Sequence, residues 1–106
     1  MPKYLVQASY TAEGLRGLQK DKASGRKQAV LNAVEPLRGK IESFYYAFGD
    51  DDVVVILDMP DNVNAAAMSL AISASGLVRL KTTPLLTVEE TDQALAKSVN
   101  YRAPGK

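Results

Sequence analysis

The chain has no cysteine, no histidine and no tryptophan among its 106 residues. Without cysteine it has no disulfide, no thiolate nucleophile, no zinc–thiolate site and no iron–sulfur cluster. Without histidine it has no Ser-His-Asp triad, no histidine metal cage and no imidazole base. These absences exclude most of the common enzyme mechanisms, and we expect neither a bound metal nor a cofactor.

An excess of charge of one sign is also missing, as is a long hydrophobic run. Thirteen Lys and Arg face twelve Asp and Glu, for a net charge of +1, which leaves no electrostatic footprint for nucleic acid or an acidic membrane. The most apolar stretch, residues 63–74, is shorter than the ~20 residues that span a bilayer. Residues 1–4 lack the apolar core of a secretory signal. We therefore expect a cytoplasmic protein that binds neither nucleic acid nor membranes.

Hydrophobic periodicity predicts four strands and three helices. Residues 3–10 are β-rich, and helical spacing of apolar residues then runs to Leu37, with Thr11 as the N-cap. Further strands are predicted at 40–48, 53–59 and 77–86, and further helices at 61–75 and 88–97. We expect residues 1–97 to form a single domain and residues 98–106 to form a flexible tail.

The order of these elements is β-α-β-β-α-β, followed by a short C-terminal helix. This is the split βαβ, or ferredoxin-like, α+β arrangement. In it, two helices lie on one face of a four-stranded antiparallel sheet. The other face is bare, so it should be polar at every second strand position.

The apolar side chains exceed what one small domain can bury. The strand over 40–48 is predicted to carry Phe44, Tyr46 and Phe48 on one face and Ile41, Tyr45 and Ala47 on the other. The next strand is apolar on both faces, and the helix that follows has no charged residue from 62 to 78. We expect a homodimer or a larger homo-oligomer. The alternative is that the C-terminal helix covers the bare face within one chain.

Two cations, Lys22 and Arg26, fall on the apolar arc of the first helix. A cation on a core-facing arc is costly to bury unless a nearby negative group compensates its charge. One interpretation is a small anionic ligand, or a carboxylate, in a cleft under this helix, and Asp52 is the first candidate for that carboxylate. The other is that Ser24-Gly25 breaks the helix and leaves both cations in water.

Two further features have possible chemistry. Pro2, if exposed by removal of Met1, has a secondary amine that serves as the base in N-terminal-proline tautomerases. The run Asp50-Asp51-Asp52 offers carboxylate oxygens to a hard cation. It lacks the spaced ligands of a calcium loop, so we expect a solvated hairpin turn without a metal.

Across residues 1–90 the chain resembles the GYD-domain family. The resemblance rests on Tyr10-Thr11-Ala12-Glu13-Gly14, Arg26, Gly39-Lys40-Ile41, Gly49 to Asp52, Pro60-Asp61, Gly76-Leu77-Val78-Arg79 and Thr82. The family's Gly-Glu-Tyr-Asp-Val-Val motif stands here as Gly49-Asp50-Asp51-Asp52-Val53-Val54, with Asp51 in place of the tyrosine. Leu77 also stands where the family commonly has an asparagine. The resemblance implies a small bacterial protein of unassigned activity in the dimeric α/β-barrel, ferredoxin-like group.

Three functions remain open at this point. The first is a small-molecule-binding module whose ligand lies between sheet and helices, with Tyr10, Arg26, Asp52 and Arg79 as the candidate binding residues. The second is a cofactor-independent enzyme, either monooxygenase-like or tautomerase-like. The third is a structural assembly protein whose apolar second helix builds a larger oligomer.

Overall fold

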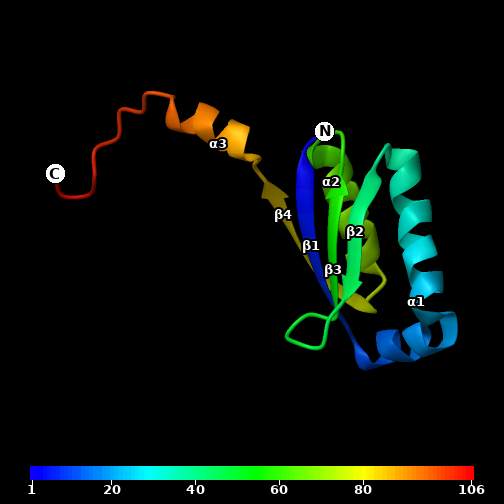
Figure 1. The fold of residues 1–106 in the computed structure, drawn as a ribbon. Coiled ribbons are helices and arrows are strands. Elements are labelled where there is room, and N and C mark those ends of the chain that lie inside the picture. The colour runs from blue at the N-terminus through cyan, green and yellow to red at the C-terminus, as the bar shows by residue number, and fades with distance from the viewer.

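A computed structural model describes all 106 residues, and its elements follow the predicted order (Figure 1). The elements are β1 (Lys3–Tyr10), α1 (Ala12–Val34), a 3-10 turn (Glu35–Leu37), β2 (Lys40–Tyr46), β3 (Val53–Asp58), α2 (Asn62–Ala74), β4 (Val78–Leu85) and α3 (Val88–Leu95). Residues 96–106 contain no helix or strand. None of the helices is both long enough and apolar enough to cross a membrane.

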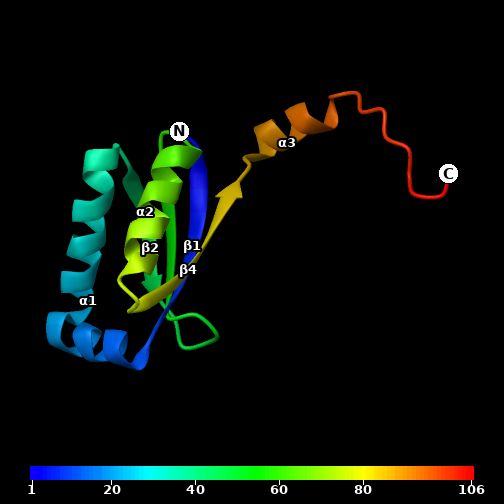
Figure 2. The same ribbon diagram turned by 180° about the vertical axis from the view of Figure 1, so that it is seen from behind.

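The four strands form one antiparallel sheet in the order β2-β3-β1-β4, so the predicted α+β class with a four-stranded antiparallel sheet is confirmed. Helices α1 and α2 both lie on one face of this sheet (Figures 1 and 2). Helix α3 continues beyond the end of β4 and stands away from the sheet. The radius of gyration is therefore 16.9 Å, where a compact chain of this length would have about 13 Å. The alternative in which the C-terminal helix covers the bare face is wrong.

Each helix begins at a residue whose side chain satisfies a free backbone N–H. The side chains of Thr11, Asp61 and Thr87 accept hydrogen bonds from the N–H groups of the first turns of α1, α2 and α3. At α3 the Glu90 side chain also accepts from the backbone of Thr87, which completes a capping box. The cap at Thr11 was predicted from the sequence, and it is confirmed.

The core lies between the sheet and the two helices. Alternate residues of β1 and β3 are buried there, and Val34 of α1 and Met68 of α2 close the layer from above. In β2 a bulge between Ile41 and Ser43 changes the expected alternation. Ile41 and Phe44 consequently pack on the same, helix-covered face, and the prediction that Ile41 shares a face with Tyr45 is wrong.

The bare face has an apolar centre between two polar ends. Pairing places Leu5 beside Ile56, while Val54 lies beside Tyr45, which is 68% exposed. At one end, the ammonium group of Lys3 lies 2.9 Å from the carboxylate of Asp58 and 3.0 Å from that of Glu42. These two carboxylates, Asp58 first, raise the pKa of Lys3 above its usual value. Because its centre is apolar, this bare face is only partly suited to contact with water.

Two backbone breaks, one within α1 and one at its exit, occur at non-glycine residues, although a glycine is near each of them. Helix α1 is broken at Lys22 (φ 67°, ψ 165°), three residues before Gly25, and nothing in the local sequence explains that choice. The helix exit has Arg38, not Gly39, in the left-handed region (φ 63°). Gly39 is required for a different reason, since a Cβ there would lie 2.5 Å from the sulfur of Met59.

Candidate functional site

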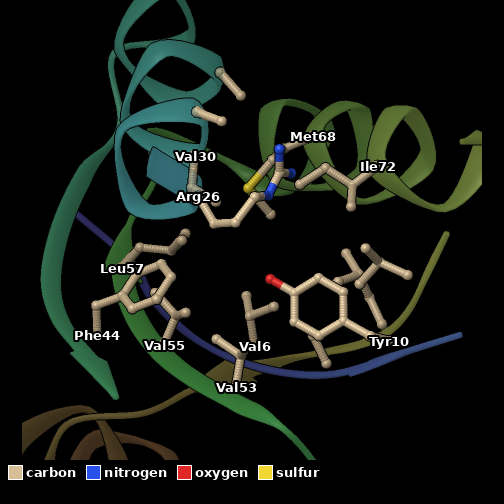
Figure 3. Close-up of a pocket in the computed structure, with 15 residues that line it drawn as sticks. Val6, Tyr10, Arg26, Val30, Phe44, Val53, Val55, Leu57, Met68 and Ile72 are labelled. Atoms are coloured by element: carbon tan, nitrogen blue, oxygen red, sulfur yellow. The ribbon is translucent and has the colours of Figure 1, made fainter. Parts of the chain in front are cut away.

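A cavity of about 90 Å³ lies between the covered face of the sheet and helices α1 and α2. Fourteen of its fifteen lining residues are hydrophobic. Strand residues such as Val6, Val55 and Phe44 form its floor, and Met68 and Ile72 of α2 form one wall (Figure 3). The one charged group at this cavity is the guanidinium of Arg26. We call this space the inner cavity.

Arg26 reaches the inner cavity because the break at Lys22 separates α1 into two helical parts. In the second part, Arg26 shares one face with Ala29, Val30 and Ala33, which follow at helical spacing and also line the cavity. Its guanidinium extends over the cavity toward Met68 and Ile72 (Figure 3). Lys22 is exposed, so only one of the two predicted cations faces the cavity.

The acidic neighbour of Arg26 is Asp21 rather than the expected Asp52. Nη1 of Arg26 lies 3.4 Å from Oδ2 of Asp21, with side chains that are 33% and 44% exposed. An ion pair of this length and exposure contributes little to stability, since solvent screens both groups. The guanidinium is therefore available to a better partner.

Asp52 has a different role, which is to fix the end of β1. Its carboxylate accepts a hydrogen bond of 2.8 Å from the backbone N–H of Tyr10, and its own N–H donates to the carbonyl of Ala8 at 2.8 Å. These two bonds continue the strand ladder where β3 has not yet begun. Asp52 does not line the inner cavity, but it positions Tyr10, whose hydroxyl points into it (Figure 3).

Tyr46 lies next to Tyr10 and Arg26 but does not line the inner cavity. Its hydroxyl donates to the carbonyl of Ala23 at 3.3 Å, just before Arg26 on α1. Burial, followed by the nearby Tyr10 hydroxyl, raises the pKa of Tyr46 to about 12, and the positive charge of Arg26 opposes this rise only in part. Tyr46 therefore stays protonated, and its hydroxyl remains a donor, at any physiological pH. Tyr46 shares the helix-covered face with Phe44, as the alternation in the sequence predicts.

A second, more polar cavity of about 290 Å³ adjoins the first. Tyr10, Arg26, Ile72 and Val78 line both cavities, whereas Asp21 lines only the second. We call this the outer cavity. Arg26 and Tyr10 thus stand where an apolar chamber meets a polar one, which is the arrangement of a site for an amphipathic small molecule.

Arg79 does not belong to this cleft. It pairs with Ser9 in the β1–β4 register, and its exposed side chain lies on the bare face, while its neighbours Val78 and Leu80 line the inner cavity. Because successive strand residues point to opposite faces, Arg79 cannot act together with Arg26 in one chain. Its grouping with Tyr10 and Arg26 was wrong.

The acidic run is not a simple solvated turn. Oδ2 of Asp51 lies 3.4 Å from Nε2 of Gln7 and 3.8 Å from Nζ of Lys81, its Oδ1 accepts from Ser9 at 3.3 Å, and its side chain is only 18% exposed. The expected solvated turn is therefore corrected to a loop held against the bare face. No group of three or more acidic side chains is placed to hold a metal ion.

Pro2 lies far from the cleft. Its carbonyl accepts a hydrogen bond of 3.0 Å from the N–H of Met59, at the end of β1 opposite to Tyr10. Eight residues of extended strand correspond to roughly 26 Å. A proline amine at this position would not act on a molecule beside Arg26.

The structural class of this protein is α+β, with two helices over one face of a four-stranded antiparallel sheet and a small apolar cleft between them. The family model for the GYD domain matches residues 4–95, which is nearly the whole chain. The chain belongs to the GYD domain family. No curated protein matches it.

Proposed function

We propose that this GYD-family chain is an oligomeric small-molecule-binding module and that its ligand, a small anion, occupies the cleft beneath α1 and α2. The observation that carries the proposal is a half-buried guanidinium, weakly paired, at the mouth of an otherwise apolar cavity. Because this half-buried guanidinium makes only a weak contact with Asp21, it has N–H donors free for an external anion. The element order and the strand order support the finer assignment of the fold as ferredoxin-like.

A fragment titration followed by amide and methyl NMR tests whether the cleft binds ligands. We expect small acids and small apolar compounds at millimolar concentration to shift the signals of Val6, Val55 and Met68. The variant Ala29→Leu fills the inner cavity and should abolish these shifts. Ala71→Leu, on the exposed side of α2, is the matched control and should retain them. Shifts that survive in Ala29→Leu, or their absence for every fragment, would contradict the proposal.

The proposal includes self-association through the bare face of the sheet. Leu5, Val54, Ile56 and Tyr45 form an apolar centre there, and polar groups surround it. The exposed apolar side chains of α3, including Leu95 at 77% exposure, extend beyond the sheet edge and would lie against the second copy. Each copy then covers apolar surface that neither covers alone.

Sedimentation velocity tests this association. We expect the unmodified chain to sediment as a dimer or larger oligomer at micromolar concentration, and Tyr45→Glu to shift it toward monomer. Leu70→Glu introduces the same charge at a similarly exposed position (70%) on α2 and should leave the oligomer unchanged. A monomeric unmodified chain would refute the proposed interface, as would equal effects of the two variants.

Two alternative functions have specific support. Tyr10, Tyr46 and Arg26 are groups that stabilise a developing anion, which suits a cofactor-independent enzyme of the dimeric α/β-barrel type. The exposed apolar stripe of α2, with Val63 and Leu70, suits a structural assembly protein. Turnover of a bound ligand would favour the first alternative. Loss of higher oligomers in Leu70→Glu, with no ligand in the cleft, would favour the second.

A further inference from the structure

We infer that the ligand of this cleft is a short-chain monocarboxylic acid, with its hydrocarbon part in the inner cavity and its carboxylate on Arg26. This inference rests on the proposed function, and it adds the chemical class of the ligand. Three properties of the cleft support it: the volume of the inner cavity, the position of Arg26 between the two cavities, and the presence of one cation only.

The volume limits the hydrocarbon part. The inner cavity, about 90 Å³, is less than a third of the volume of the outer cavity, about 290 Å³. The hydrocarbon part that enters it is therefore small, such as a short alkyl chain. The walls of the inner cavity are hydrophobic side chains of four strands and two helices, so they offer dispersion contacts and leave almost no polar group to satisfy.

The position of Arg26 determines where the charged end lies. Arg26 and Tyr10 line both cavities, so a carboxylate attached to the hydrocarbon part reaches them at the junction. A guanidinium offers parallel N–H donors that match the two oxygens of a carboxylate. The present partner, Asp21, is 3.4 Å away and partly exposed, so a ligand carboxylate in closer contact displaces it.

The count of charges determines the class of acid. Arg26 and Asp21 are the only charged residues that line either cavity. One positive charge compensates one carboxylate, and a second carboxylate would be held in an apolar chamber or beside Asp21 without compensation. A dicarboxylate is therefore disfavoured, and a neutral amide loses the charge-assisted hydrogen bonds. Inorganic phosphate has no hydrocarbon part, so it gains nothing from contact with the apolar walls.

Calorimetric and NMR titrations with four probes test the inference: butyrate, butyramide, succinate and inorganic phosphate at pH 7. We expect butyrate to bind about tenfold or more tightly than each of the other three, since charge-assisted hydrogen bonds and apolar burial act together only in butyrate. The affinity should fall modestly with salt, because Arg26 is partly exposed.

Three variants show whether the stated residues are responsible. Arg26→Gln should reduce butyrate affinity about tenfold or more and remove the preference over butyramide. Lys27→Gln removes the same charge from an exposed neighbouring position and should change butyrate affinity less than twofold. Asp21→Asn leaves Arg26 in place and should tighten butyrate binding, because it removes the competing carboxylate. This last variant keeps the test decisive even if Arg26→Gln fails to fold.

The outcomes separate this inference from the proposed function. Equal binding of butyrate and butyramide in the cleft would overturn the acid class and leave the binding module intact. Tighter binding of succinate would overturn the argument from a single charge. Binding of none of the probes, together with no shift from any fragment, would overturn both. Weaker butyrate binding in Asp21→Asn would show that Asp21 supports the site and does not compete for it.

Discussion

Leu57→Ala is expected to lower the free energy of unfolding by about 2–5 kcal/mol. Leu57 lies in β3, next to the centre of the sheet, and it is 1% exposed. Removing its side chain forfeits its burial and leaves a void beside the inner cavity, which the packed strands cannot close. Urea denaturation followed by circular dichroism measures the change.

Leu70→Ala is the matched control for this substitution. It removes the same atoms from an exposed position on α2, so we expect a change within about 0.5 kcal/mol. A loss in Leu57→Ala similar to that in Leu70→Ala would mean that the strand residues beneath the helices are not a packed core. The cleft would then have no rigid floor.

Gly14→Ala is expected to destabilise the chain by about 1–3 kcal/mol through overpacking. A Cβ at Gly14 would overlap the backbone carbonyl oxygen of Leu77, and that oxygen already accepts a hydrogen bond of 3.0 Å from the N–H of Thr11. Because this neighbour is backbone, it has no rotamer that relieves the overlap. The start of α1 must shift instead, and the outer cavity, which Gly14 lines, changes with it.

Gly17→Ala lies one turn further along the same helix and gives the opposite prediction. Nothing lies within 4 Å of a Cβ at Gly17, and alanine is the better helix former. We expect a gain of about 0.5–1 kcal/mol in the free energy of unfolding. Thermal unfolding of both variants measures the contrast. Equal effects would contradict the close contact between α1 and Leu77, the residue before β4.

The elements of this fold could be predicted from the sequence because their signals are local. Thr11, Asp61 and Thr87 are caps whose partners lie three residues away, so each helix start can be recognised within four residues. The alternation of buried residues in β1 and β3 likewise needs no knowledge of distant contacts.

The site was predicted only in part, since its arrangement depends on non-local geometry. The bulge after Ile41 adds one residue to β2 and brings Ile41 to the same face as Phe44, and no residue type in the sequence indicates this bulge. The break at Lys22 decides which cation of α1 faces the sheet. The alternation in β4 separates Arg79 from the apolar Val78 and Leu80, so the position of Arg79 away from the covered face can be recognised from the sequence. The role of Asp52 follows from a hydrogen bond across 42 residues, which composition cannot reveal.

The separation of the N-terminus from the cleft has a practical consequence. Pro2 is held at the end of β1 opposite to Tyr10, and Met1 beside it is exposed. A linker joined before Met1 would therefore attach the chain to a sensor surface with the mouth of the cleft facing the solution. A fluorophore on the projecting segment after β4 would respond to the approach of a second copy instead. One chain labelled at both ends thus reports ligand capture and assembly as independent signals.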